Sequence, residues 1–195
     1  MRHGRSRANE AGLIVSDPNE GCEDWGLAEG AGAEIVSSVA ASGLPQGIMV
    51  VSSPFLRTRE TADIAARILR SPPVGTVPGF RERYFGDWDL GSDDRYPEVW
   101  AADSGNPDNT AGGVESPASV LARFLEAVDE IGRADGPADV LIVSHGDPLN
   151  ILLAYVEGFG PEEHRRVAGM KTAEIRPLPL RGASSHRSGN LYWNS

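Results

Sequence analysis

Two short, uninterrupted runs of apolar residues predict the most deeply buried strands of this chain. They lie at residues 48–52 and 140–143. Consecutive apolar positions are typical of strands that are covered on both faces, as in a parallel sheet. Weaker patterns predict further strands at residues 75–78, 172–178 and 190–193. The chain therefore contains the strands of one mostly parallel sheet.

Apolar residues at helical spacing alternate with these strands. They predict helices at residues 29–41, 54–69, 116–132 and 148–155, with Pro54, Pro117 and Pro148 in or near a first turn. Strands that alternate with helices are typical of an α/β fold. We therefore expect a three-layer α/β/α sandwich around a mostly parallel central sheet.

Residues 12–26 and 87–115 lack such periodicity and are rich in Gly, Asp, Asn and Pro. The second segment is long enough to form a lid or rim over a site. No segment has the composition of an interdomain linker. We therefore interpret residues 1–195 as a single domain.

Composition and charge narrow the function classes. The formal net charge of −10 argues against a nucleic-acid partner and against an anionic membrane surface. The single cysteine, Cys22, and the lack of a signal pattern predict a cytoplasmic protein. No spacing of His and Cys predicts a metal site, and nothing predicts a cofactor. The oligomeric state is not readable from the sequence.

Three segments carry side chains that suit a phosphoryl group. They contain His3 near the start, Arg57 after the first apolar run and His145 after the last one. Ligands of open α/β sheets bind beyond the carboxyl ends of the strands, where helix N-termini also face an anion. A neutral imidazole can attack phosphorus, and arginines can hold its oxygens. Glu82 is the candidate acid that would protonate the leaving group.

These segments resemble the histidine phosphatase superfamily, in its phosphoglycerate-mutase-like branch. The resemblance rests on Arg-His-Gly at residues 2–4, Ser-Ser-Pro and the following residues at 52–62, Glu82 before Phe-Gly-Asp-Trp at 85–88, and His-Gly at 145–146. All four motifs occur in the order that the family has. Together they extend over most of the chain.

The resemblance implies a role for each of these residues. His3 would be the phosphorylated nucleophile and Glu82 the proton donor and acceptor, without a metal. The phosphoryl group would be held by Arg2, Ser6, Asn9, Arg57, His145 and Gly146. Asp147 is an alternative acid if Glu82 is misplaced, and Thr58 replaces the usual alanine of the second motif.

The start of the chain departs from the family pattern. The family has an apolar central strand before Arg-His-Gly, whereas only Met1 precedes Arg2 here. We expect this strand to be missing or truncated, which would leave His3 on a fraying terminus. Either the native protein starts further upstream, or the chain begins here with a weakened or inactive site, and its cationic α-amine would then lie near the phosphate pocket.

The predicted function is hydrolysis of a small phosphomonoester. A phosphoglycerate mutase is the alternative, but the acidic segment after Glu82 lacks the cations that would hold a substrate carboxylate. A phosphate-binding protein without activity is a third possibility.

The other histidines, the cysteine and the tryptophans are expected to have no catalytic role. His164 and His186 are expected on the surface, and the Cys22 thiol is expected to be unactivated. The tryptophans are expected in packing or rim positions: Trp25, Trp88, Trp100 and Trp193.

Overall fold

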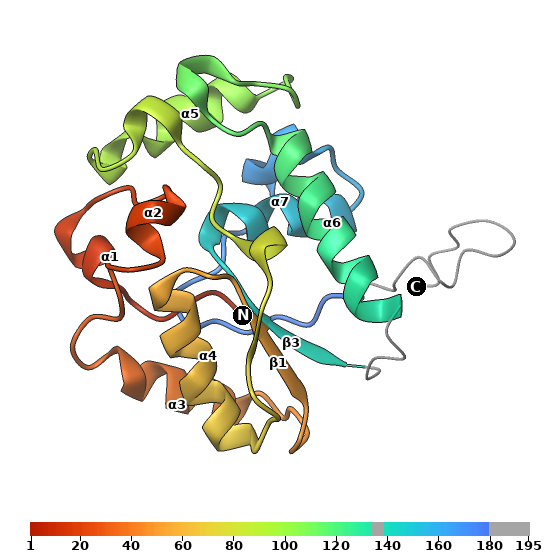
Figure 1. Ribbon diagram of the computed structural model, residues 1–195. Coiled ribbons are helices and arrows are strands. Elements are labelled where there is room, and N and C mark those ends of the chain that lie inside the picture. The colour runs from red at the N-terminus through yellow and green to blue at the C-terminus, as the bar shows by residue number, and fades with distance from the viewer. Residues whose placement is uncertain (134–138, 180–195) are drawn as a thin grey trace, which may run out of the picture.

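The computed structural model describes residues 1–133 and 139–179 (Figure 1). Its sheet is parallel and has the order β2 (Gly75–Thr76), β1 (Met49–Ser52), β3 (Val140–Val143). Met49 pairs with Val140 and Ser52 with Val143, so the two longer strands end side by side. The strands predicted at 48–52 and 140–143 are confirmed.

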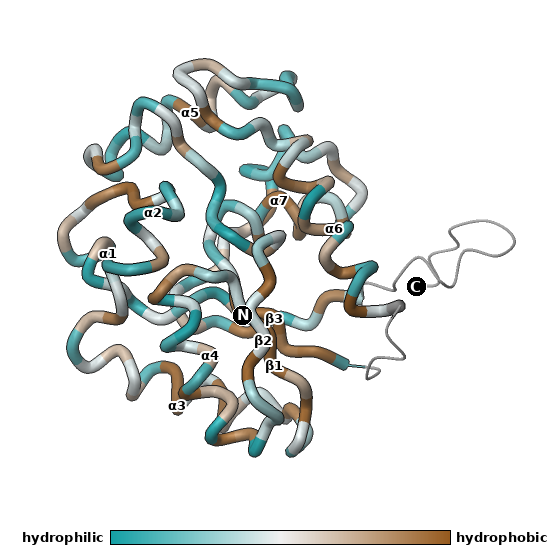
Figure 2. The backbone as a smooth tube through the Cα atoms, in the orientation of Figure 1, coloured by the Kyte–Doolittle hydropathy of each residue, from teal (hydrophilic) through white to brown (hydrophobic). Residues whose placement is uncertain are grey.

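Helices cover both faces of the sheet. α3 (Ala31–Ala41) and α4 (Leu56–Leu69) pack on one face, and α6 (Pro117–Arg133) and α7 (Gly146–Val156) pack on the other. Successive side chains of β1 point to opposite faces of the sheet, so Val50 lies in the core with α3 and α4 and Val51 lies in the core with α6 and α7. Figure 2 shows β1 and β3 as hydrophobic segments between these layers. The predicted three-layer sandwich is confirmed.

The first residues of the chain form a one-residue stub beside β3. Ser144 donates its backbone N–H to the Met1 carbonyl, and the His3 N–H is donated to the Ser144 carbonyl, each at 3.0 Å. On the other side, Arg2 donates to the Glu174 carbonyl. This truncated strand is paired on both sides, so the expected fraying of His3 is wrong: its side chain is only 3% exposed.

The Met1 amine also differs from its expected state. It lies in the core and donates to the Ile142 carbonyl at 2.7 Å. Burial lowers the pKa of this amine to about 5. It is therefore mostly uncharged at neutral pH. Contrary to our expectation, the amine does not line the phosphate pocket.

The two segments without periodicity fold over the carboxyl ends of the strands. Residues 12–26 contain α2 (Pro18–Gly21), and residues 87–115 contain α5 (Tyr96–Asp103) and short 3-10 turns. Ile14 joins the two segments through backbone hydrogen bonds to Gly91 and Leu90, and it packs in a small core of their own. We call residues 7–26, which include α1 (Arg7–Ala11), and residues 84–115 the cap; it forms the upper left of Figure 1.

The strands predicted at residues 172–178 and 190–193 are not confirmed by the described part of the chain. Residues 172–178 form a turn and extended chain instead of a strand, although Glu174 and Ala173 still make backbone hydrogen bonds with Arg2 and His3. Residues 190–193 lie outside the described part of the chain. Among the described residues, none of the helices combines the length and apolarity needed to cross a bilayer.

Candidate active site

A cavity of about 310 Å³ lies between the carboxyl end of the sheet and the cap. His3 follows the stub, Arg57 lies in the first turn of α4 after β1, and Gly146 begins α7 after β3. Seven of the predicted site residues line this cavity: Arg2, His3, Ser6, Asn9, Arg57, Glu82 and Gly146. His145 is fully buried immediately behind them. Segments that are far apart in the sequence thus meet at one edge of the sheet.

The protonation state of His3 is fixed by its two neighbours. Its Nδ1 lies 2.7 Å from the Gly4 carbonyl, which can only accept, so Nδ1 carries the proton. Its Nε2 lies 3.2 Å from Nε of Arg57, which can only donate, so Nε2 holds the lone pair. The nitrogen that could attack an electrophile is therefore Nε2, on the side of the ring that faces Arg57.

The surroundings of His3 also keep the imidazole neutral. Burial lowers its pKa well below 6.5, and the positive charges of Arg57 and Arg2 lower it further. An uncharged ring is required for attack on phosphorus, because an imidazolium has no free lone pair. His3 is therefore in the reactive form at neutral pH.

His145 is a second buried, neutral imidazole. Its Nε2 lies 2.8 Å from the Ser53 hydroxyl, and its ring packs edge-on against His3 at a centroid distance of 5.3 Å. Nδ1 lies 3.5 Å from Glu82 Oε2 and makes no hydrogen bond within the described chain. Burial, followed by the charge of Arg57, lowers the pKa of this ring well below 6.5. His145 therefore contributes dipoles and not a charge.

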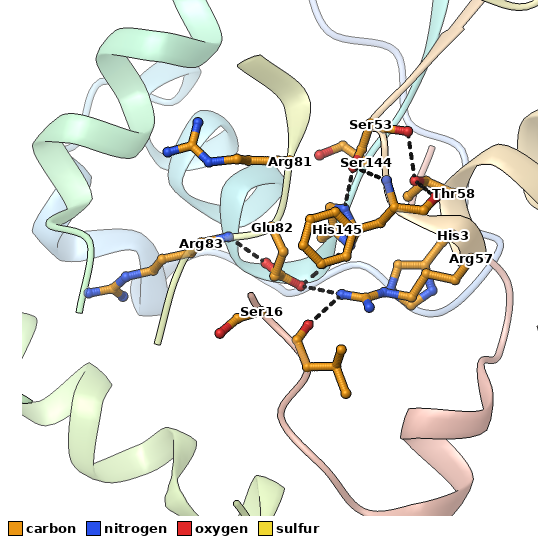
Figure 3. Close-up of polar contacts among 12 residues, drawn as sticks. His3, Ser16, Ser53, Arg57, Thr58, Arg81, Glu82, Arg83, Ser144 and His145 are labelled. Atoms are coloured by element: carbon orange, nitrogen blue, oxygen red, sulfur yellow. Dashed lines mark hydrogen bonds and ion pairs between the residues drawn. The ribbon is translucent and has the colours of Figure 1, made fainter. Parts of the chain in front are cut away.

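The Glu82 carboxyl group has the environment of a proton donor. It is only 6% exposed, and burial raises its pKa to about 7 against the opposing effect of Arg57, whose Nη2 lies 3.4 Å away. Its sequence neighbours point elsewhere in Figure 3: Arg81 pairs with Glu115, and Arg83 pairs with Asp103. Glu82 can therefore exchange a proton near neutral pH.

Several buried polar atoms at this edge of the cavity lack a hydrogen-bond partner in the described chain. They include Nε of Arg2, Nη1 of Arg57 and Nδ1 of His145. Buried donors without partners are costly and uncommon in native proteins. An anion placed beside His3 would satisfy Arg57 in particular, because guanidinium forms strong, directed hydrogen bonds with phosphate oxygens.

Ser6 and Asn9 line the cavity but also hold each other. The Ser6 hydroxyl accepts from the Asn9 backbone N–H, and Asn9 Oδ1 accepts from Ser6, which forms the capping box of α1. Gly146 has a steric role, since a Cβ there would lie 3.3 Å from Cζ of Arg2. Arg2 is further anchored by a hydrogen bond to the Met170 carbonyl.

A buried ion cluster behind Glu82 was not predicted. Arg83 forms a bidentate ion pair with Asp103, with N–O distances of 2.7 and 2.8 Å, and a further pair with Asp147 at 3.1 Å. Asp147 is thus a partner of Arg83, while Glu82 lies beside Arg57 and His145. His164 lies fully buried, 3.8 Å from Asp103, so its predicted surface location is wrong. His186 lies outside the described residues.

The outer wall of the cavity includes Tyr96 and Arg165, which the sequence did not point to, and Trp100, which was expected in a packing or rim position. Trp100 stacks on Tyr96 with the rings 6° from parallel, and its Nε1 donates to Asp147 at 2.9 Å. Arg165 lies over the Trp100 ring at 3.8 Å. All of these side chains line the cavity. They come from α5 and from the turn after α7, and no local motif marks either segment.

Comparison with known proteins agrees with this geometry. Residues 1–184 match the model of the histidine phosphatase superfamily (branch 1). The chain is 28% identical over 159 residues to a metal-independent phosphoserine phosphatase from Arabidopsis thaliana, covering 78% of this chain and 65% of the plant protein. The match thus spans slightly less than two thirds of that relative.

A bacterial relative and a solved structure extend the comparison. An adenosylcobalamin/alpha-ribazole phosphatase from Salmonella typhimurium is 26% identical over 162 residues, which cover 79% of this chain and 76% of that protein. A mycobacterial glucosyl-3-phosphoglycerate phosphatase, solved with VO3, has a TM-score of 0.71 at 25% identity, covering 88% and 87% of the two chains. The chain therefore belongs to the histidine phosphatase superfamily, branch 1.

Proposed function

We propose that this protein is a metal-independent phosphatase that hydrolyses a small phosphomonoester through a phosphohistidine on His3. One observation carries the proposal: the neutral Nε2 of His3 faces the Arg57 guanidinium, whose Nη1 lacks a partner among the described residues, with the Glu82 carboxyl group 3.4 Å from Nη2. Nucleophile, phosphate-binding cation and acid thus meet at one point.

The first step forms the phosphoenzyme. Nε2 of His3 attacks phosphorus while the P–O bond to the alcohol breaks, and Glu82 transfers its proton to the leaving oxygen. Arg57 exchanges its hydrogen bond to Nε2 for bonds to the phosphoryl oxygens, and Arg2 adds positive charge to their surroundings. The Nδ1–H bond to the Gly4 carbonyl keeps the ring aimed throughout.

The second step releases phosphate. Glu82 is now a carboxylate, and it takes a proton from a water molecule that attacks phosphorus opposite His3. The P–N bond breaks, the electron pair returns to Nε2, and Glu82 is again protonated. A pKa of about 7 suits both steps, because the same group must give up a proton and then recover it.

The proposed substrates are small. A cavity of about 310 Å³ accommodates a phosphoryl group and an alcohol of a few heavy atoms. The relatives named above are phosphatases, including one described as metal-independent, which supports hydrolysis over phosphoryl transfer. The alternatives, a phosphoglycerate mutase and a phosphate-binding protein without activity, are distinguished by the following test.

The test is hydrolysis of p-nitrophenyl phosphate in EDTA by the unchanged chain, by His3→Ala and by Arg59→Ala. Arg59 lies on the same helix as Arg57 but donates to the Cys22 carbonyl, so it serves as the control. We expect His3→Ala to lose at least about a thousandfold in activity, and Arg59→Ala to retain it.

Four results would contradict the proposal. Activity that survives in His3→Ala would exclude this nucleophile, and activity abolished by EDTA would exclude a metal-independent reaction. Phosphate binding without turnover would favour the binding protein. Phosphoryl exchange between mono- and bisphosphoglycerate that outpaces hydrolysis would identify a mutase.

A further inference from the structure

The Arg165 guanidinium lies over an aromatic platform at the mouth of the cavity. It lies 3.8 Å from the centre of the Trp100 ring, which is itself fixed by the hydrogen bond to Asp147 and by stacking on Tyr96. Stacking of this kind orients a guanidinium and leaves its N–H edges free.

Arg165 forms no hydrogen bond or ion pair within the described part of the chain, which distinguishes it from its neighbour. Arg166 pairs with Glu163 at 2.5 Å and packs over Phe159, and it does not line the cavity. Arg165 is exposed and lines the same cavity as His3. Two adjacent arginines on one turn thus differ in orientation, and only Arg165 presents an unpaired cation to a bound substrate.

We propose that Arg165 and Trp100 form a subsite for a carboxylate on the alcohol portion of the substrate. The proposal rests on the phosphatase function and specifies its substrate class, an acidic phosphomonoester such as a phosphorylated hydroxy acid. The cavity is small, so an anionic group a few bonds from the phosphorus reaches its wall. The planar fork of a guanidinium matches the two oxygens of a carboxylate.

The neighbouring charges favour a carboxylate over a second phosphate. Asp93 and Asp147 line the same cavity, and a doubly charged group there would meet more repulsion from these carboxylates than a singly charged one. We expected the acidic segment after Glu82 to lack the cations that would hold a substrate carboxylate, and the proposed subsite lies outside that segment. Arg165 comes from a different part of the chain, the turn after α7.

The test compares 3-phosphoglycerate with glycerol 3-phosphate, which has a hydroxymethyl group in place of the carboxylate. We expect kcat/KM of the unchanged chain to favour 3-phosphoglycerate by about tenfold to a hundredfold, the range of one charge-assisted pair. Arg165→Met is expected to bring this ratio close to one. Arg166→Met, the matched control, is expected to keep the ratio.

A ratio near one in the unchanged chain, or a ratio that Arg165→Met leaves intact, would overturn the subsite. Hydrolysis of p-nitrophenyl phosphate, measured alongside, separates this failure from failure of the phosphatase function. If no substrate is turned over, calorimetric binding of the same two compounds to the chain decides, with the same dependence on Arg165. Arg165-dependent preference for propane-1,3-diol bisphosphate over 3-phosphoglycerate would assign the subsite to phosphate and contradict the carboxylate.

Discussion

The proposed mechanism requires a neutral His3 imidazole and a protonated Glu82 carboxyl group, and burial favours both forms. Burial disfavours whichever form of a group is charged, so it lowers the pKa of the His3 imidazole and raises the pKa of the Glu82 carboxyl to about 7. Arg57 contacts both side chains; it reinforces the effect on His3 and opposes the effect on Glu82. One arginine thus influences the pKa of both the proposed nucleophile and the proposed acid.

This arrangement predicts the pH dependence of activity. With glycerol 3-phosphate, kcat/KM should fall as the pH rises through about 7, because Glu82 loses the proton that the alkoxide needs. The acid limb should lie well below pH 6.5, where His3 becomes protonated. Glu82→Gln should remove the alkaline limb and lower kcat/KM by about a hundredfold or more.

The leaving group provides the control for this prediction. p-Nitrophenolate departs without full protonation, so Glu82→Gln should reduce formation of the phosphoenzyme from p-nitrophenyl phosphate much less than from glycerol 3-phosphate. Single-turnover kinetics with both substrates measures the difference. Equal losses with the two substrates would show that Glu82 acts in another way.

At the scale of elements, close packing of α3 and α4 against the first loop positions His3. Gly4 donates its N–H to Thr61 of α4 at 3.0 Å. A Cβ on Gly4 would lie 2.7 Å from Cδ1 of Ile35 on α3 and 3.1 Å from Cδ2 of Leu27. The Arg-His-Gly motif therefore needs its glycine for packing, independently of the chemistry of the histidine.

Two glycine substitutions test this packing. Gly4→Ala should lower the free energy of unfolding by about 1–3 kcal/mol, because Ile35 must move. Gly32→Ala, on α3 itself, would place its Cβ 3.7 Å from Ile64 and should raise stability by up to about 1 kcal/mol through helix propensity. Urea denaturation of both variants measures the effects, and equal stabilities would contradict the described contact.

The elements that the sequence predicted well are those with a local signal. Residues 48–52 and 140–143 are apolar without interruption, and each is followed by a helix, so both strands and the motifs at their ends could be located. The cap could not be predicted, because it depends on contacts such as those between Ile14 and residues 90–91. The burial of His164 and the place of Arg165 likewise depend on partners that are distant in the sequence.

At the scale of the whole molecule, the buried site makes stability depend on pH. Glu82 has an ordinary pKa of 4.5 and a raised value of about 7 in the folded chain, so its favourable contribution is complete below about pH 4.5 and is lost as the pH rises towards 7. His3 and His145 have lowered values, so their contribution is present above pH 6.5 and is lost on acidification. These opposite pH dependences partly cancel in the free energy of unfolding of the unchanged chain.

Glu82→Gln separates them. The stability of this variant relative to the unchanged chain should rise by about 2–3 kcal/mol between pH 5 and pH 8, since the amide does not ionise. Glu98→Gln, at an exposed position on α5, is the control and should show no comparable change. Chemical denaturation at several pH values provides the measurement, and a flat difference would show that the pKa of Glu82 is not raised.

The identity of the phosphorylated residue is the most direct test of the catalytic account. The measurement is rapid-quench trapping with a 32P-labelled phosphomonoester, followed by digestion and mass spectrometry of the labelled peptide. The account predicts an acid-labile, base-stable phosphoryl group on His3, formed as fast as the alcohol is released and absent from His3→Ala. Label on another residue, or turnover without any phosphoenzyme in single-turnover conditions, would contradict it.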